Sequence, residues 1–376
     1  MSFHGERVSD RRGANGQIPY ELEICPCSRL ECASGDNGEK IGRNPLKTTA
    51  KNVTVHTERT FAIARSSTDS FERVIFEIEE NGVVGIGEAA PTNYYGQTAK
   101  EVAEALEAAV VPDPWDIEGA LTENADLPST ALAALDNALH DLAAKRLGVP
   151  LHKLLGLAKP ETQSAFTLGI AEPEETLAEA RRLSSFPILK MKVGSWRDIE
   201  TVKAVAEFSD AELWVDANEA FSPDEAVEAA ISLREAGVAM IEQPVAASAG
   251  TLAMRRAMEA AHPVPLIADE SSLVASDIPK LAGCVSGVNV KMAKCGGIRN
   301  ALKMVYTARA HGMLVMLGCM VETSVGIAAA AHISGLFDFV DLDGAMLLAD
   351  DPYSGPTYEN GRIILTDEPG LGVWER

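Results

Sequence analysis

The chain has 376 residues, enough for two domains or for one barrel with additions, and 46% of them are hydrophobic. Its formal net charge of −22 argues against nucleic acid and anionic membranes as partners, because both are negatively charged. No apolar run approaches the roughly 20 residues of a membrane span. Met1–Arg12 has no apolar segment like that of a signal peptide, and the six cysteines do not suggest a disulfide framework. We therefore expect a cytoplasmic protein.

Residues 1–45 differ from the rest of the chain. They are rich in Gly, Asn, Ser and Arg and lack apolar periodicity, which predicts a disordered extension. Cys25, Cys27 and Cys32 are the residue type of a zinc knuckle, but no well-spaced fourth ligand accompanies them. A disordered extension is therefore the prediction for this segment.

Residues 46–155 predict an α+β domain. The segment Arg73–Glu79 alternates between the two faces of a strand and meets Asn81-Gly82, a strong type I′ hairpin signal, before Val83–Glu88. Helical patterns follow at residues 97–110, 115–121 and 129–147. The loop between the hairpin and the first helix contains two adjacent tyrosines, Tyr94 and Tyr95.

Residues 156–345 alternate between strands and helices, which predicts a parallel sheet. Helical patterns include residues 173–183, 223–236 and 298–310. The strand candidates are residues 163–170, 188–193, 213–216, 240–242, 266–269, 288–292, 314–317 and 339–341. Eight strands in short units favour a (β/α) barrel over an open sheet. No regular helix follows the last strand, and we expect the tail, residues 346–376, to return to the first domain.

Polar residues recur at the predicted strand ends every 24 to 27 positions, close to the length of one βα unit. They are Lys192, Asp216, Glu242, Asp269, Lys294 and Cys319. Equal steps bring such side chains to similar heights around the carboxyl end of a barrel, where catalytic residues gather. The pattern therefore predicts one site that is built from successive strands.

Three of these residues are carboxylates that end apolar runs: Asp216, Glu242 and Asp269. Any one of them alone is as well explained as a helix N-cap at a strand-to-helix turn. Three converging carboxylates would repel one another unless a cation lies among them. Oxygen ligands without His or Cys select Mg²⁺ over zinc, so we expect a magnesium site with Asn218 and Glu270 beside it.

Two lysines flank the expected metal site in the sequence, Lys192 before it and Lys294 after it. In a closed eight-stranded barrel the second and sixth strands lie on opposite sides, so the two ammonium groups would face opposite sides of a substrate α-carbon. This arrangement is what a racemase or epimerase requires. Lys190 shares a face with Lys192 and would add positive charge and a contact to the developing oxyanion. We assign Lys291 to the other face, because its offset from Lys294 is odd.

Residues 50–376 resemble the enolase superfamily and, within it, the muconate-lactonizing-enzyme subgroup. The motifs K-x-K, D-x-N, E-Q-P, A-D-E-S and K-x-G-G occur in family order, together with Gly87-Glu88-Ala89 and the segment Ala134–Leu142. The resemblance implies a modified (β/α)7β TIM barrel, with an N-terminal α+β capping domain that the C-terminal tail completes. It also implies Mg²⁺ and removal of a proton next to a carboxylate.

Asp341-Leu342-Asp343, at the end of the eighth strand, looks like the D-x-D motif of dipeptide epimerases. Two carboxylates on one face suit the free α-ammonium of a dipeptide, although such a pair also caps turns. The same resemblance implies substrate contacts at Thr167, Lys190, Cys319 and Val321. The resemblance therefore implies an isomerase that inverts the C-terminal α-carbon of a dipeptide, with Lys192 and Lys294 as acid and base.

Related activities stay open: N-acylamino acid racemase, o-succinylbenzoate synthase and muconate cycloisomerase. A non-catalytic binding protein is disfavoured, because no lysine or metal ligand is missing. The expected partner is a small-molecule substrate, and a homo-oligomer stays open. In Ala-Glu epimerases of the family, an arginine in the loop after the first strand binds the glutamate side chain. Ser66 aligns there, one position after Arg65, which speaks against Ala-Glu specificity unless the alignment slips by one residue. Tyr94 and Tyr95 are explained equally well by an apolar or aromatic C-terminal residue and by packing between the domains, so the preferred dipeptide stays open.

Overall fold

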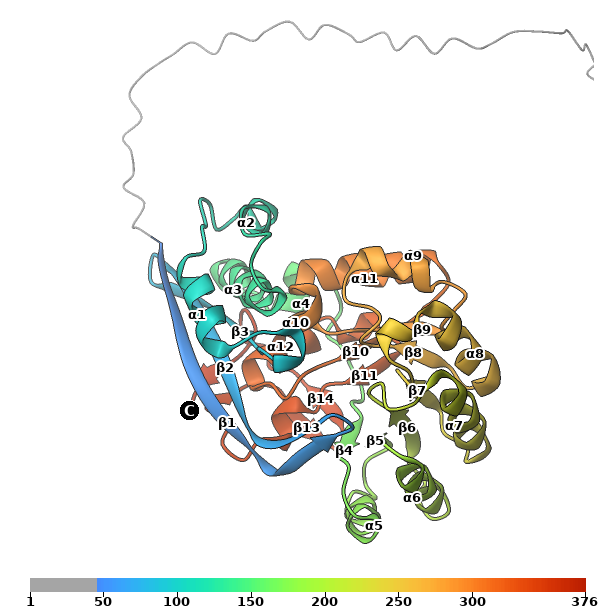
Figure 1. Ribbon diagram of the computed structural model, residues 1–376. Helices are drawn as coiled ribbons and strands as arrows, with labels where there is room; N and C mark the ends of the chain where they lie inside the picture. Colours follow the sequence, from blue (N-terminus) through green and yellow to red (C-terminus); the bar gives the residue numbers. More distant parts are fainter. Residues whose placement is uncertain (1–45) are drawn as a thin grey trace, which may run out of the picture. The chain divides into compact units, whose positions relative to one another are not determined.

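A computed structural model describes residues 46–376, so the predicted extension with Cys25, Cys27 and Cys32 lies outside the described residues. The N-terminal domain begins with an antiparallel sheet of order β1-β2-β3 (Figure 1). Its strands are β1 (Lys47–Ile63), β2 (Ser66–Glu80) and β3 (Val83–Ala89). Asn81 and Gly82 both have positive φ, 54° and 81°, as the hairpin signal predicted. The 17-residue β1 and its tight turn to β2 were not predicted.

Five helical segments follow the sheet in the chain, and the second and fourth of them pack on it. In order, they are η1 (Asn93–Tyr95), α1 (Ala99–Glu107), α2 (Ile117–Glu123), α3 (Ser129–Leu147) and α4 (Leu151–Leu154). The backbone of α3 lies directly on β3, where a Cβ at Gly85 or Gly87 would come within 2.2 Å or 2.1 Å of a helix carbonyl. Only glycine fits there, and this explains the Gly87-Glu88-Ala89 motif.

The second domain is a barrel of eight strands, in the order β11-β10-β9-β8-β7-β6-β5-β4, with every neighbouring pair parallel (Figure 1). The strands are β4 (Phe166–Leu168), β5 (Ile188–Lys192), β6 (Glu212–Asp216), β7 (Met240–Glu242), β8 (Leu266–Ala268), β9 (Gly287–Val290), β10 (Leu314–Gly318) and β11 (Phe339–Asp341). The two ends of the sheet meet where the Ala165 amide donates to the Val340 carbonyl at 2.9 Å. The expected barrel is confirmed.

Helices surround the barrel and pack on the outward side chains of its strands. They are α5 (Pro173–Arg182), α6 (Trp196–Ala206), α7 (Pro223–Glu235), α8 (Thr251–Ala261), α9 (Ile278–Leu281), α10 (Met292–Cys295), α11 (Ile298–Ala310) and α12 (Ser324–Ala331). Short 3₁₀ turns are η2 (Ala247–Ala249), η3 (Ala275–Asp277), η4 (Ser334–Leu336) and η5 (Gly344–Leu347), and η5 stands where an eighth helix would follow β11. Trp214, Met240, Ile267 and Met316 form a separate buried cluster.

The C-terminal tail forms β12 (Tyr353–Ser354), β13 (Thr357–Glu359), β14 (Arg362–Ile364) and β15 (Trp374–Glu375). Its Leu371 amide donates to Asp141 on α3 at 2.7 Å, and the Ala349 amide donates to the His56 carbonyl on β1 at 2.8 Å. These contacts support the proposed division into 46–155, 156–345 and a returning tail 346–376. Among residues 46–376, no helix has the length and apolar character to span a bilayer.

Contacts between the N-terminal domain and the barrel include two at the ends of barrel strands. Ser129, at the start of α3, donates to the Ala293 carbonyl in α10 at 3.0 Å, and Asp136 accepts from the Arg299 amide in the first turn of α11 at 3.0 Å. At the other place, the turn between β1 and β2 packs on the end of β4, where the Ile170 amide donates to the Ala62 carbonyl at 2.8 Å. Both contacts lie at the carboxyl ends of barrel strands.

Candidate active site

A cavity of about 740 Å³ lies between the carboxyl ends of the barrel strands and the N-terminal domain. Of the residues predicted from the sequence, the barrel contributes Thr167, Lys190, Lys192, Asn218, Asp269, Glu270, Cys319, Val321, Asp341 and Asp343. The N-terminal domain contributes residues from the β1–β2 turn and from the loop with Tyr94 and Tyr95. Of the six residues in the stride, Lys192, Asp269 and Cys319 line the cavity, whereas Asp216, Glu242 and Lys294 do not.

The three predicted metal ligands lie on adjacent strands. Asp216 ends β6, Glu242 ends β7 directly opposite it in the sheet register, and Asp269 follows β8. All three are buried, with at most 2% of their surface exposed. Each is close to a lysine: Asp216 Oδ2 to Lys192 Nζ at 2.6 Å, Glu242 Oε2 to Lys190 Nζ at 2.7 Å, and Asp269 Oδ2 to Lys291 Nζ at 2.8 Å.

The charge balance of this cluster is uneven. Burial, reinforced by the charge of Asp216, raises the pKa of Glu242 to about 7. Burial also acts to raise the pKa of Asp216, but Lys192 and Lys190 outweigh it and bring that pKa below its usual range. At Glu242 the neighbouring lysines therefore do not fully compensate for burial and for the charge of Asp216. A bound cation would stabilise the ionised form of this carboxylate.

The cluster is a candidate site for a divalent cation. Within residues 46–376, no group of three carboxylate, histidine or cysteine side chains is already drawn together as ligands, and the carboxylates instead face lysines. The donor chemistry nevertheless fits, because all three groups are carboxylates. Oε2 of buried Glu242 accepts no well-aligned hydrogen bond, although Lys190 Nζ lies 2.7 Å from it. Its other oxygen accepts from Asn289 Nδ2 at 2.6 Å, which fixes the carboxylate in place.

Lys291, rather than Lys294, lines the cavity. The prediction treated both as residues of one strand, but β9 ends at Val290 and Lys294 lies in the one-turn helix α10. The alternation of a strand therefore does not reach Lys294, and this part of the prediction was wrong. Lys291 faces Asp269, and the carboxylates around it outweigh its burial, so its pKa lies above the usual range.

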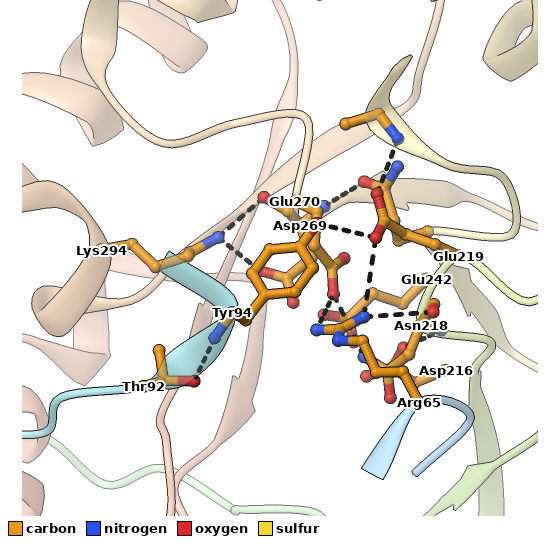
Figure 2. A network of polar contacts seen from close by, with 12 residues as sticks. Arg65, Thr92, Tyr94, Asp216, Asn218, Glu219, Glu242, Asp269, Glu270 and Lys294 are labelled. Carbon is orange, nitrogen blue, oxygen red and sulfur yellow. Dashed lines mark hydrogen bonds and ion pairs between the residues drawn. The ribbon is translucent and has the colours of Figure 1, made fainter. Parts of the chain in front are cut away.

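Lys294 is buried below this surface and is held at several points (Figure 2). Its Nζ donates to the Asp269 carbonyl at 2.8 Å, to the Asn289 carbonyl at 3.1 Å and to the Ser272 carbonyl at 3.2 Å. It also pairs with the Asp269 carboxylate. All three protons of the ammonium thus have acceptors in the protein, and none is directed at a substrate.

The D-x-D pair lies on the last strand of the barrel, where Asp341 ends β11 and Asp343 follows it. Both Asp341 and Asp343 line the cavity, as the period of two predicted. Asp343 accepts from the Thr167 amide at 2.6 Å, and Asp341 accepts from Lys190 at 2.7 Å. Burial, and then the charge of Asp341, raise the pKa of Asp343 to about 7. A second excess of negative charge therefore faces the cavity.

The segment after β10 also borders the cavity. Burial, with the nearby charges of Asp343 and Asp341, raises the pKa of the Cys319 thiol well above its ordinary value, so this thiol stays protonated. The Val321 carbonyl accepts from Arg73 Nε on β2 at 2.6 Å. Glu88 on β3 accepts from the Thr323 amide at 3.0 Å and from the Gly326 amide at 2.9 Å. The N-terminal sheet therefore holds this segment in place.

Two family models match the chain. "Mandelate racemase / muconate lactonizing enzyme, N-terminal domain" matches residues 47–156, and "Enolase C-terminal domain-like" matches residues 174–374. The chain belongs to this family of the enolase superfamily. The resemblance expected from the sequence motifs is thereby confirmed.

Relatives within the family carry dipeptide epimerase names. The chain is 39% identical over 322 residues to the L-Ala-D/L-Glu epimerase of Bacteroides thetaiotaomicron, covering 83% of this chain and 84% of the relative. It is 39% identical over 342 residues to the hydrophobic dipeptide epimerase of Roseobacter litoralis, covering 85% and 96%. These names differ in the dipeptide, so sequence identity alone does not choose a substrate.

Solved structures are similar over most of the chain. The dipeptide epimerase of Enterococcus faecalis V583 complexed with Mg and L-Leu-L-Tyr has a TM-score of 0.82 and 32% identity, covering 87% of this chain and 98% of that chain. The muconate lactonizing enzyme of Pseudomonas fluorescens complexed with muconolactone also has a TM-score of 0.82, with 27% identity and coverage of 89% and 96%. The fold is therefore shared by family members that act on different compounds.

Proposed function

We propose that this chain is a Mg²⁺-dependent dipeptide epimerase that inverts the α-carbon of the C-terminal residue by proton transfer between two lysines. The observation that carries the proposal is the placement of charge in the cavity. Two groups of carboxylates, one on β6 to β8 and the other Asp341 and Asp343, lie on either side of Lys190, whose Nζ is 2.7 Å from both Glu242 and Asp341. A dipeptide has one group for each side: a carboxylate for a metal and a free α-ammonium for the D-x-D pair.

Asp216, Glu242 and Asp269 would hold the Mg²⁺ ion. When bound, the ion supplies positive charge that stabilises the substrate carboxylate as its α-proton leaves. The binding of Mg²⁺ by the relatives complexed with Mg and a dipeptide supports this assignment. Asn289 orients Glu242, and Glu270 and Asn218 stand next to the ligands as predicted.

Lys192 and Lys291 are the proposed acid and base, and Lys291 replaces Lys294 in this assignment. Lys192 ends β5 and Lys291 follows β9, four strands further around an eight-stranded barrel, so the two approach from opposite sides. One lysine accepts the α-proton from one face while the other donates a proton to the opposite face, which inverts the centre. For this transfer the first must be neutral and the second charged.

The remaining residues bind and orient the dipeptide. Asp341 and Asp343 would accept from the α-ammonium, and the hydroxyl of Thr167 donates to Asp341 at 3.3 Å. Lys190, which is 1% exposed, would contact the substrate carboxylate. Cys319 and Val321 line the cavity and would contact the peptide. The free thiols of Cys284, Cys295 and Cys319 support the proposal that the protein works in a reducing cytoplasm.

The proposal is tested by incubating the protein in D₂O with Mg²⁺ and pools of L,L-dipeptides, and reading deuterium incorporation by mass spectrometry. Deuterium is expected at the C-terminal α position. Asp343→Asn should lower exchange of dipeptides by about tenfold to a hundredfold, since it removes a charge-assisted hydrogen bond to the ammonium. If N-succinyl amino acids exchange while no dipeptide does, the function is an N-acylamino acid racemase and the proposal fails.

A further inference from the structure

Arg65, in the turn between β1 and β2, extends across the mouth of the cavity to the barrel (Figure 2). Its Nη2 donates to Glu270 Oε1 at 2.7 Å, and its Nη1 donates to the Asn218 carbonyl at 3.1 Å. The Glu270 side chain is only 1% exposed, whereas that of Arg65 is 31% exposed. Arg65 is therefore the cation that makes the direct ion pair with this buried carboxylate, with Lys291 as a second nearby positive charge, and losing the pair would be costly.

Tyr94 completes the contact from the other loop of the N-terminal domain. Its ring lies against the guanidinium, 4.1 Å from ring centroid to Arg65 Cζ. Its hydroxyl donates to Glu219 Oε2 at 2.7 Å, and Glu219 Oε1 accepts from the Ala247 amide at 2.7 Å. Arg65 Nη1 is also 3.7 Å from Glu219. Arg65, Tyr94, Glu219 and Glu270 thus form one network, called here the latch, which joins both loops to the barrel.

The latch changes what the cavity offers to a substrate side chain. Five cationic residues line the cavity in the described part of the chain, and each has a carboxylate within 4 Å. On the N-terminal side the two cations are Arg65, paired with Glu270 at 2.7 Å, and Arg73, 3.9 Å from Glu88 and bound to the Val321 carbonyl. No unpaired cation is therefore available among these residues for a carboxylate side chain.

Part of the cavity wall on the N-terminal side is apolar, although Ser66, Ser67, Thr68 and Ser70 also line it. Phe61, Ile63, Phe71, Val321 and Leu347 line the cavity, and all of these except Ile63 also pack in one apolar cluster with Val55 and Leu348. An apolar or aromatic side chain that entered here would bury its surface at no cost in unpaired charge, whereas a glutamate side chain would lose its hydration without gaining a partner.

We propose that Arg65 is a positioning residue that closes the cavity through the latch, and that the enzyme therefore takes dipeptides with an apolar or aromatic C-terminal residue and discriminates against acidic ones. This inference rests on the proposed dipeptide epimerase function and specifies its substrate class.

The test compares kcat/KM for L-Ala-L-Phe, L-Ala-L-Leu, L-Ala-L-Lys and L-Ala-L-Glu in the wild type, Arg65→Met and Tyr94→Phe, all with saturating Mg²⁺. The wild type should favour the two apolar substrates over L-Ala-L-Glu by at least about 50-fold. Arg65→Met should lower kcat/KM for all four substrates by a similar factor, about tenfold. The ratio of kcat/KM for the apolar substrates to that for L-Ala-L-Glu should stay within about threefold of the wild-type ratio. Tyr94→Phe, which keeps the ring, should have a smaller effect of the same kind.

Hydrogen exchange gives a readout that does not depend on turnover. Amides of residues 61–68 and 91–97 should exchange faster in Arg65→Met, because the first loop loses its ion pair with Glu270 and the second loses the contact of Tyr94 with the guanidinium. The matched control is Arg59→Met, an arginine of β1 whose partner Glu179 lies outside the cavity lining, and this variant should match the wild type in both measurements.

Three results would overturn the inference: a wild type that prefers L-Ala-L-Glu or L-Ala-L-Lys over the apolar pair, an Arg65→Met variant that loses only L-Ala-L-Glu, or unchanged exchange in both loops. A protein that exchanges no dipeptide at all would instead refute the proposed function, so the two failures are distinguishable.

Discussion

The barrel side of the cavity carries its polar groups on the ends of parallel strands, whereas the N-terminal side carries them on a hairpin turn and a short loop. On the barrel side, Lys190, Asp216, Glu242 and Asp341 are held by sheet register and are almost completely buried. On the N-terminal side, Arg65 and Tyr94 are partly exposed and are held mainly by contacts to the barrel. The proposed proton transfer thus depends on side chains fixed by the barrel strands. The proposed substrate selectivity depends on side chains from the two loops of the N-terminal domain.

The largest effect on activity is expected at the two proposed catalytic lysines of the barrel. Lys192→Ala and Lys291→Ala should each lower the rate of epimerisation by about 10³-fold to 10⁴-fold, because each removes one of the two groups that move the proton. The measurement is the change in optical rotation of a dipeptide substrate with time. Lys203→Ala, an exposed lysine of α6, is the control and should retain wild-type activity. A wild-type rate in Lys291→Ala would contradict this assignment and would favour Lys294 as the second acid-base lysine.

Lys294 should respond in a different way from Lys291. Lys294→Met leaves the Asp269 carboxylate and three buried carbonyls without the ammonium, and should lower the free energy of unfolding by about 3–5 kcal/mol. Lys291→Met, whose lysine faces the cavity, should lose less stability and more activity. Urea denaturation followed by circular dichroism measures the difference. Equal stability of the two variants would contradict the separation of roles.

A smaller effect is expected at a junction remote from the cavity lining, where His332 at the end of α12 is 1% exposed. Its Nδ1 accepts from the His152 amide at 3.2 Å, and burial lowers the pKa of His332 to about 4. The unfolded chain binds a proton there below its ordinary pKa of about 6.5, but the folded chain does not until about 4. Stability should therefore fall as the pH drops from about 6.5 to 4, by up to about 3 kcal/mol.

The contribution of His332 is isolated by comparing the wild type with His332→Gln. Glutamine keeps one acceptor and one donor but does not titrate in this range. Urea midpoints of the two proteins should converge as the pH falls from about 7 to about 4.5. If the difference between the two urea midpoints stays constant over this pH interval, His332 contributes nothing to the pH dependence of stability.

The sequence predicted the barrel side better than the N-terminal side, and the reason is geometric. Strand alternation and a constant βα stride are local patterns, so the sequence alone sufficed to assign Asp216, Glu242 and Asp269 to one mouth of the barrel. The same rule failed directly after β9, where the chain turns into α10. As a result Lys291, and not Lys294, lines the cavity. A strand end is set by hydrogen bonding to neighbouring strands, which a single sequence does not display.

The latch could not be predicted from the sequence at all. Arg65 and Ser66 are adjacent in the chain and both line the cavity, but only the structure shows that the guanidinium pairs with Glu270, 205 positions away. A hairpin turn has no periodicity to show which side chain points inward. The expectation from alignment therefore stopped at two neighbours, and the structure adds that Arg65 pairs with Glu270.

Helix α3 has a consequence for protein engineering. It touches β3 at the two glycines, and through Ser129 and Asp136 it also holds the segment that follows Lys291. Exchanging the whole N-terminal domain between relatives would therefore disturb a proposed catalytic lysine, even though no residue of the barrel is altered. Grafting only residues 61–68 and 91–97 leaves α3 in place. New selectivities are thus more accessible by transplanting loops than by recombining domains.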